Sequence, residues 1–362
     1  MRRLYAISLM CILLGYGCAP SMEPQRRSIA LSASPEDVFI DGAVESKAGG
    51  SVSADPYTGS PSMSNSLDAS LWFSYDAGSY SHNPAVPQNL PCATVVSYES
   101  SEPADIRHEG QLILYPIPVD ENYAEVGDDV YCVGFSPSTG WGELTASAVS
   151  SAGHAINGSE DLMFADQMVG SYSDNFAPQT YRHLLTWIRI NMSTTSLKAA
   201  EIWGDVESLE IVSPNRMLSV DFSNSLQDGV PQASTIGYSG GPEGFHLALP
   251  ANSSLNVTTK LFGQAFCAPP ASAALNGSGE YEYLTDDSGE LGYIIRVKTK
   301  NIPQKEVFVK LKKEDNITLI ESADYAVGKL FVVNLHFNDI AVVEGVCTLR
   351  QWDDQNSDIY LN

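Results

Sequence analysis

The pentapeptide Gly237-Tyr238-Ser239-Gly240-Gly241 has the spacing of a chemical motif, because it fits the GxSxG pattern of a hydrolase nucleophile elbow. Such an elbow needs a helix directly after the serine. Here Pro242 and Gly244 follow the two glycines, and a run of this kind breaks a helix before it can form. We therefore interpret the run as a glycine-rich turn. With no lysine or helix after it, it is not a phosphate cradle either.

The spacing of histidines and carboxylates gives no sign of a catalytic or metal site. None of the six histidines stands in an HxH, HExxH or HxxxH arrangement. His183 and His336 fall on strand candidates, where a histidine with a satisfied structural role is the more common case. Paired carboxylates such as Asp128-Asp129 are adjacent in sequence, whereas the fold places glycosidase carboxylates about 5–10 Å apart. The sequence therefore predicts no enzyme, no cofactor and no metal.

Four cysteines follow the first eighteen residues, and none of them shows the CxxC spacing of zinc or redox motifs. Two fall in each half of the chain: Cys92, Cys132, Cys267 and Cys347. One disulfide in each half fits an exported protein, and isolated buried thiols fit the spacing equally well. The sequence leaves both alternatives and the connectivity open.

The N-terminus has the layout of a bacterial signal peptide. Arg2-Arg3 is followed by a largely apolar run from Leu4 to Leu14 and then by Gly15-Tyr16-Gly17-Cys18. The apolar run is shorter than the about 20 residues that span a membrane. Small residues before a cysteine are typical of a lipobox, so we predict that residues 1–17 are removed and that Cys18 carries the lipid. The alternative is a plain secretory signal in which Cys18 has no role.

Residues 18–47 are predicted to form a polar tether with strand-like segments. Ser28–Ala33 alternates in polarity, and Val38–Val44 is a second short strand candidate. The segment ends at Lys47, a basic residue before a small, glycine-rich loop of the kind that proteases enter easily. We predict Lys47 as a proteolytic processing site.

Composition and charge exclude some classes of function. The chain has 362 residues, which suffices for two domains, and its 43% hydrophobic and 18% charged residues are typical of a globular protein. Its formal net charge is −24, and loss of Arg2 and Arg3 with the signal peptide makes it −26. Such a surface repels phosphate groups, so no nucleic-acid partner is expected.

The charge is distributed unevenly along the chain. Residues 48–181 hold 17 acidic residues and one basic residue, Arg107, whereas residues 182–362 hold 22 acidic and 14 basic residues. Half of the latter form what we call the basic stripe: Arg296, Lys298, Lys300, Lys305, Lys310, Lys312 and Lys313. One half of the chain is therefore uniformly acidic, and the other carries a local concentration of positive charge.

Short alternating segments bounded by turn residues predict an all-β protein. A polar stretch at 171–175 coincides with the change in charge, so we predict one β-sandwich over residues 48–175 and a second over 176–362. The strand candidates are 71–75, 93–98, 111–115, 130–135, one long strand at 181–192, 206–212, 245–249, 255–261, 292–299, 306–311, 329–337 and 340–352.

Several of these stretches together resemble the fimbrillin family, the type V pilus subunits of Gram-negative anaerobes. The similar stretches span almost the whole mature chain, and each of them is short. They are Cys18 in its lipobox-like context, Val38–Gly49 as a first strand ending at a basic-Ala step, Asp161–Ala165, Tyr181–Ile188, Leu247–Ala251, Gly328–Leu335 and Trp352. The order of the set is more specific than any one of its members.

The resemblance implies two tandem transthyretin-like β-sandwich domains after a lipoprotein signal peptide. It also implies a lipid anchor in the outer membrane and assembly with other fimbrial subunits into a cell-surface fimbrium that supports adhesion. In that family a trypsin-like protease removes the first strand, and the open groove accepts a strand from the next subunit. In this chain the donor candidate is Ile340–Cys347 with the tail to Leu361.

Lys47 matches the family's processing position, but it is a departure because that position is commonly arginine. A cut at Arg26 or Arg27 would instead leave the strand in place, and an uncleaved subunit would serve as an anchor or terminal component. Whether the subunit is shaft, anchor or tip stays open. We also hypothesise that the acidic first domain of one subunit faces the basic stripe of its neighbour.

The alternative prediction is a monomeric outer-membrane lipoprotein that binds a glycan or a host protein. It depends on aromatic residues of the first domain that could stack on sugars, namely Trp72, Tyr75, Tyr80 and Trp141. Strand spacing places Trp72 in a core more often than on a surface.

Overall fold

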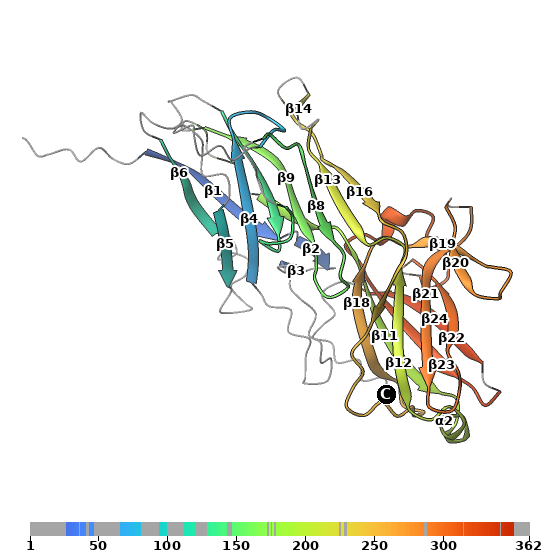
Figure 1. Cartoon of the computed structure of the whole chain (residues 1–362). Coiled ribbons are helices and arrows are strands. Elements are labelled where there is room, and N and C mark those ends of the chain that lie inside the picture. Colours follow the sequence, from blue (N-terminus) through green and yellow to red (C-terminus); the bar gives the residue numbers. More distant parts are fainter. Residues whose placement is uncertain are drawn as a thin grey trace, which may run out of the picture.

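The structure is a computed structural model, and it describes residues 27–35, 37–40, 43–46, 66–80, 94–99, 112–119, 129–142, 147–171, 174, 176, 179–223, 226–227, 230–285, 288–313, 315–340 and 342–350. It is almost entirely β, which confirms the predicted fold class (Figure 1). No helix in this part of the chain is long and apolar enough to cross a membrane.

The first half is built on a seven-stranded sheet with the order β5-β4-β7-β9-β10-β1-β6. Its strands are β1 (Arg27–Pro35), β4 (Ser66–Ser74), β5 (Thr94–Glu99), β6 (Leu112–Val119), β7 (Val130–Ser136), β9 (Met163–Gly170) and β10 (Gln179–His183). The N-terminal strand β1 thus lies inside this sheet, between strands that come much later in the chain.

The second half consists of two larger sheets. A four-stranded sheet has the order β18-β11-β23-β24, with β11 (Thr186–Thr194), β18 (Lys260–Cys267), β23 (Leu330–Phe337) and β24 (Val343–Arg350). A six-stranded sheet has the order β17-β12-β21-β19-β20, with β22 also paired to β21. Its strands are β12 (Val206–Ser213), β17 (Glu243–His246), β19 (Ala271–Leu275), β20 (Tyr281–Tyr283), β21 (Leu291–Thr299) and β22 (Lys305–Lys310).

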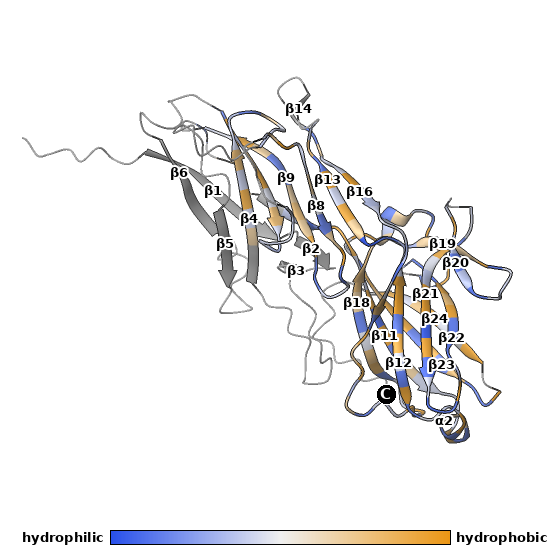
Figure 2. Cartoon of the chain, in the orientation of Figure 1, coloured by the Kyte–Doolittle hydropathy of each residue, from blue (hydrophilic) through white to orange (hydrophobic). Residues whose placement is uncertain are grey.

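Three smaller sheets complete the fold. β8 (Ser151–Ala155), β13 (Met217–Asp221) and β16 (Thr235–Ser239) pair in the order β16-β13-β8, and the two others are β14 (Leu226–Gln227) with β15 (Val230–Pro231) and β2 (Asp37–Ile40) with β3 (Ala43–Ser46). Among the described strands, pairing crosses residue 175 three times, between β1 and β10, between β9 and β10 and between β8 and β13. The two halves share one continuous apolar cluster. Apolar residues run along β4, β12 and β13 (Figure 2).

In the described part of the chain, two short helices connect strands. The helix α2 (Leu197–Trp203) begins where the Ser196 side chain accepts a hydrogen bond from the Ala199 N–H, and it ends at Gly204 with a φ of 75°. Trp203 anchors it, because the buried ring packs 4.9 Å from the Phe337 ring and its indole N–H donates to the Asn338 carbonyl. The second helix is the 3₁₀ turn η1 (Ala323–Ala326).

The long strand predicted at 181–192 is wrong in one respect, because the chain leaves one sheet and enters another at Leu184-Leu185. β10 pairs with β9 and β1 in the first sheet, whereas β11 pairs with β18 and β23 in the second. Ile188, Ile190 and Met192, which alternate along β11, are all buried. The transthyretin-like topology and the domain limits stay predictions.

Candidate strand-exchange site

The strand β1 joins two strands that do not otherwise pair in the described part of the chain. Its C-terminal residues Ala33–Pro35 run parallel to Gln179–Tyr181 of β10. On its other side, Arg27–Ala33 runs antiparallel to Leu112–Val119, with a register shift between Ile29 and Leu31. The sheet therefore reaches β6 only through β1.

The register of β6 shows which of its edges can accept a strand. Pro118 lies opposite Ser28, between the pairs Arg27–Val119 and Ile29–Ile117. Hydrogen-bonded and non-hydrogen-bonded pairs alternate along an antiparallel ladder, and a proline has no N–H to donate. Pro118 therefore occupies a non-hydrogen-bonded position and presents its missing donor to the outer edge, the usual place for proline in an edge strand. The edge that pairs well is the edge that β1 occupies.

The sheet next to β1 is buried on both faces. One face belongs to the continuous apolar cluster through Trp72, Val133, Phe135 and Phe164. The other, which we call the second face, consists of residues that are at most 2% exposed: Ala69, Leu71, Phe73, Val130, Cys132, Met163, Ala165 and Tyr181. Strands with near-continuous apolar residues are typical of a sheet that is covered on both sides. Exposure of the second face would be unfavourable by about 25 cal/mol per Å².

Tyr181 links the second face to β1. It lies on β10, is the register partner of Pro35, and is fully buried. Its ring crosses to β7, where a Cβ at Gly134 would overlap the phenol oxygen, so only glycine fits there. In the described part of the chain the Tyr181 hydroxyl has no hydrogen-bond partner, and burial raises its pKa well above 10.0. An orphaned buried hydroxyl costs stability, so this is a locally unfavourable position beside β1.

The prediction that Val38–Val44 is a single strand, and the first strand of the sheet, is wrong. Residues 37–40 and 43–46 pair with each other as β2 and β3, in the register Val38–Glu45 and Ile40–Ala43, and form a separate two-stranded sheet. The Asp41-Gly42 dipeptide between them is a strong hairpin signal that the prediction overlooked. The candidate for removal is therefore β1, at the place of the other predicted strand, Ser28–Ala33.

Both predicted processing residues, Cys18 and Lys47, lie outside the described residues, so their roles stay predictions. Lys47 follows β3 directly in the sequence, and a cut after it would detach β1, β2 and β3 together. Arg27 is the first residue of β1, and a cut there would leave nearly the whole strand in the chain. The donor candidate Ile340–Cys347 lies mostly in β24, paired antiparallel to β23, and the tail beyond Arg350 is outside the described residues.

The other residues that could take part in catalysis or metal binding lie in surroundings that do not support such a role. Ser239 ends β16 and is followed by Gly240 and Gly241 at φ angles of 93° and 74° and then by β17, so the elbow helix is absent. His183 Nδ1 lies 2.7 Å from the buried carboxylate of Asp161. Among the described residues, no three His, Cys, Asp or Glu side chains are grouped to hold a metal ion.

The described cysteines are buried thiols. Cys132, Cys267 and Cys347 are buried and form no disulfide, and burial raises the pKa of the Cys267 and Cys347 thiols. Cys92 lies outside the described residues. Of the two alternatives left open by the sequence, the structure supports buried thiols for these three.

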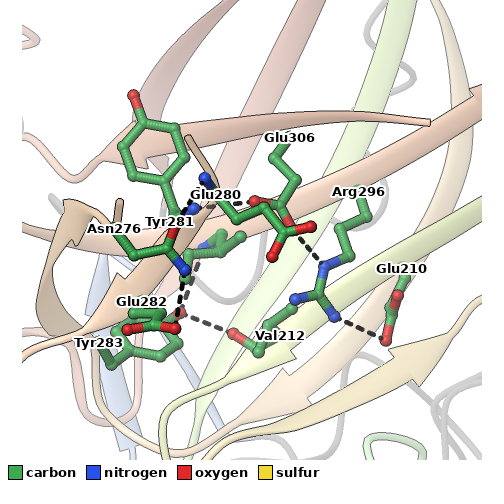
Figure 3. A network of polar contacts seen from close by, with 10 residues as sticks. Glu210, Val212, Asn276, Glu280, Tyr281, Glu282, Tyr283, Arg296 and Glu306 are labelled. Carbon is green, nitrogen blue, oxygen red and sulfur yellow. Dashed lines mark hydrogen bonds and ion pairs between the residues drawn. The ribbon is translucent and has the colours of Figure 1, made fainter. Parts of the chain in front are cut away.

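The basic stripe is largely neutralised within the second half. Figure 3 shows Arg296 between Glu210 and Glu306, with its Nε 2.6 Å from a Glu306 oxygen. These residues face one another directly across β12, β21 and β22. Other members pair in the same way: Lys298 with Glu207, Lys310 with Glu290 and Lys313 with Glu321. Local ion pairs weaken the argument that this surface attracts an acidic neighbour.

The fold defines an all-β protein of packed sheets whose N-terminal strand closes a gap in the first sheet. No protein-family model matches the chain, and no curated protein matches its sequence. Among solved structures, it is similar to a "putative cell adhesion protein" from Bacteroides uniformis, with 11% identity, a TM-score of 0.46, and coverage of 90% of this chain and 98% of that chain. A protein from Bacteroides ovatus with the same description gives the same four values.

A "putative adhesin" from Bacteroides thetaiotaomicron is similar with 9% identity and a TM-score of 0.44, over 91% of this chain and 99% of that chain. Similarity at this level establishes neither a shared family nor a shared function.

Proposed function

We propose that the chain is a structural subunit of a cell-surface fimbria, exported as a lipoprotein and assembled by exchange of β1 for a strand of another subunit. The observation that carries this proposal is the position of β1. It is the first strand of the described residues, it precedes Lys47, and it fills the gap between β10 and β6 in a sheet whose second face is apolar.

Removal of β1 would create two unpaired strand edges at once, one on β10 and one on β6. Unpaired edges are templates for another chain, because an added strand gains main-chain hydrogen bonds and its alternate side chains fill pockets. Pro118 directs such a strand to the inner edge of β6. The incoming strand would take the place that β1 occupied. The fimbria, its adhesive role and the outer-membrane location rest on the resemblance to fimbrillins.

The alternative, a monomeric glycan-binding lipoprotein, loses most of its candidate residues. Trp72, Tyr80 and Trp141 are 4%, 0% and 3% exposed, and they pack in the apolar cluster. Buried rings of this kind stabilise a core and cannot stack on a sugar without unfolding. No described aromatic cluster of the first domain favours this alternative.

The test is limited trypsin treatment of the purified full-length precursor, followed by N-terminal sequencing and sedimentation. We expect a new N-terminus at Ala48, loss of β1 and conversion of monomers to long polymers. The matched control is Lys47→Ala, which keeps the cleavage positions at Arg26 and Arg27. Cleavage of that variant at Arg27 removes the tether but keeps β1, so it should stay monomeric. Polymers formed by this control, or monomers that persist after cleavage at Lys47, would refute the proposal.

A further inference from the structure

The outer face of the four-stranded sheet carries a column of polar residues along β11. Trp187, Arg189, Asn191 and Ser193 share this face because side chains alternate along a strand. The registers give Trp187, Arg189 and Asn191 neighbours in both β18 and β23, and Ser193 a neighbour in β23. Arg189 lies opposite Gln264 on one side and Val332 on the other. Asn191 lies beside Asn334, and Ser193 beside His336.

Two rows of this column satisfy their polar groups internally. The Asn191 amide donates to the Asn334 carbonyl oxygen at 3.1 Å, and the Ser193 hydroxyl lies 2.8 Å from His336 Nδ1. Each of these hydrogen bonds joins β11 to β23 across the sheet. The polar side chains of these two rows therefore have hydrogen-bond partners within the sheet.

The row of Arg189 and Gln264 differs from both. Gln264 is 7% exposed, and among the described residues neither its Nε2 nor its Oε1 has a hydrogen-bond partner. Within the described part of the chain the Arg189 guanidinium makes no hydrogen bond or ion pair. Its carbon Cζ lies 5.9 Å from the centre of the Trp187 ring. Burial lowers the pKa of Arg189, yet arginine stays charged in proteins.

Other arginines of the chain show that this situation is unusual. Arg182 pairs with Asp166, and Arg296 pairs with Glu210 and Glu306. Arg216 is exposed and is solvated by water. A partly buried cation without a counter-ion, beside a buried amide without partners, is costly, and native proteins generally satisfy such groups with a ligand, an ion or water.

We propose that Arg189 and Gln264 form a binding site for a carboxylate group. The planar guanidinium can donate two parallel hydrogen bonds to a carboxylate, and the Gln264 Nε2 can donate a third. Gln264 Oε1 then needs a donor, so the ligand carries an N–H or O–H next to its carboxylate. An Asp or Glu of a protein chain has its backbone N–H there, and a uronic acid has a hydroxyl.

The source that the charge distribution favours is a second copy of this chain. The protein has 44 Asp and Glu residues against 20 Lys and Arg residues. An acidic neighbour of the same sequence is therefore the most abundant supply of carboxylates in any assembly of copies. A carboxylated sugar offers the same chemistry and is distinguished by the second arm of the test.

The first arm measures the thermal unfolding midpoint of the full-length precursor with sodium acetate against sodium chloride at equal ionic strength. Acetate should raise the midpoint of the wild-type protein by a few degrees and have no such effect on Arg189→Met. Without acetate, Arg189→Met should be more stable than wild type, because it removes an unpaired charge. Arg182→Met is the matched control, since Arg182 already has a carboxylate partner: it should lose stability and keep the acetate response.

Gln264→Leu provides a second variant in case Arg189→Met does not fold. It should keep the fold, because leucine replaces an amide without partners, and it should weaken acetate binding by about tenfold. The same acetate response in wild type and Arg189→Met, or no response in wild type, would overturn the proposal.

The second arm separates the two sources of carboxylate. If a second copy supplies the group, the precursor should show weak, reversible self-association in sedimentation velocity that rises with protein concentration and is competed by acetate, distinct from the long polymers that follow cleavage at Lys47. Tighter binding of glucuronate than of acetate, with a protein that stays monomeric, would assign the site to a sugar acid.

Discussion

Two parallel strand pairings among the described residues differ in extent and in sequence position. In the second half, β11 and β23 run side by side from Trp187–Leu330 to Thr194–Phe337, in the middle of their sheet. In the first half, β1 and β10 share only the short stretch from Ala33–Gln179 to Pro35–Tyr181. The long pairing joins strands deep in the chain, whereas the short one holds a strand from its N-terminal end.

The difference indicates which strand can be replaced. β11 and β23 contribute Ile188, Ile190, Phe331 and Val333 to the apolar cluster, so neither can leave without exposing the core. Peripheral elements held by short pairings open at lower free energy than core elements. The pairing of β1 with β10 is short, so β1 is expected to open more easily than β11 or β23. The gap that β1 fills is the candidate site for exchange.

The largest expected effect comes from breaking the long pairing. Val333 is fully buried in β23 and is the register partner of Ile190. Val333→Asp places a carboxylate in the core and should destabilise the protein by more than about 4 kcal/mol. Urea denaturation followed by tryptophan fluorescence measures this loss. Truncation of the chain to residues 48–362 removes β1 and leaves the β11–β23 pairing intact, so it should destabilise the monomer less than Val333→Asp does; equal damage from both changes would contradict the comparison.

The next effect comes from a residue that supports the short pairing. Gly134→Val puts a side chain where the Tyr181 ring lies, and overpacking of this kind costs about 1–3 kcal/mol. Because Tyr181 is beside Pro35, we expect β1 to be released more readily and cleavage at Lys47 to become faster in limited trypsin digestion. Gly277→Val is the control, since a Cβ at Gly277 meets no atom within 4 Å. An unchanged cleavage rate in Gly134→Val would disconnect Tyr181 from β1.

The sequence predicts those parts of the fold that are determined by patterns within a few residues. Alternation and turn residues predicted most strands, including β7, β12, β21 and β23, because these signals lie within a few residues. The sequence gives no signal for the break between β10 and β11 at Leu184-Leu185, because these two apolar residues continue the apolar pattern of the predicted strand. β13 was missed because Leu218 and Val220 give only two apolar positions in a short segment.

The candidate sites depend on register between distant segments, which a single sequence does not contain. Nothing near Ile29 indicates that β1 lies between β10 and β6, and nothing near Arg189 indicates that Gln264 lies opposite. The prediction of a removable N-terminal segment came from the position of Lys47 and from the resemblance. The Asp41-Gly42 signal was present in the sequence and would have separated β2 from β3 in advance.

A smaller effect of opposite sign is expected at the Tyr181 hydroxyl. Tyr181→Phe removes a buried group without a partner and should stabilise the protein by about 1 kcal/mol. Burial raises the pKa of Tyr181 in the folded protein, so the stability linked to its neutral form is present below pH 10.0 and is lost as the pH rises above it. The variant should lose less stability than wild type between neutral and strongly alkaline pH, as measured by urea denaturation.

Tyr238→Phe is the matched control for this prediction. The Tyr238 hydroxyl donates a hydrogen bond to the Leu184 carbonyl at 2.6 Å. Removal of the hydroxyl loses this hydrogen bond and should destabilise the protein. If both variants change stability in the same direction, the Tyr181 hydroxyl has a partner after all, and the position beside β1 is not locally unfavourable.

The smallest effect is expected on the basic stripe, where Lys310 and Glu290 form a pair with side chains 48% and 46% exposed. Exposed pairs contribute about 0–1 kcal/mol, so Lys310→Gln with Glu290→Gln should hardly change stability. The electrostatic hypothesis treats Lys310 as a free cation that attracts the acidic first domain of a neighbour, whereas the ion pair makes its local field nearly neutral. We therefore expect Lys310→Gln alone to slow polymer growth at low salt, because it leaves Glu290 unpaired, and the double variant to grow at the wild-type rate. Light scattering during trypsin-triggered assembly measures both rates. A double variant as slow as the single one would show that Lys310 itself attracts the neighbour. The second half would then contribute to assembly through charge, in addition to the strand exchange proposed for the first half.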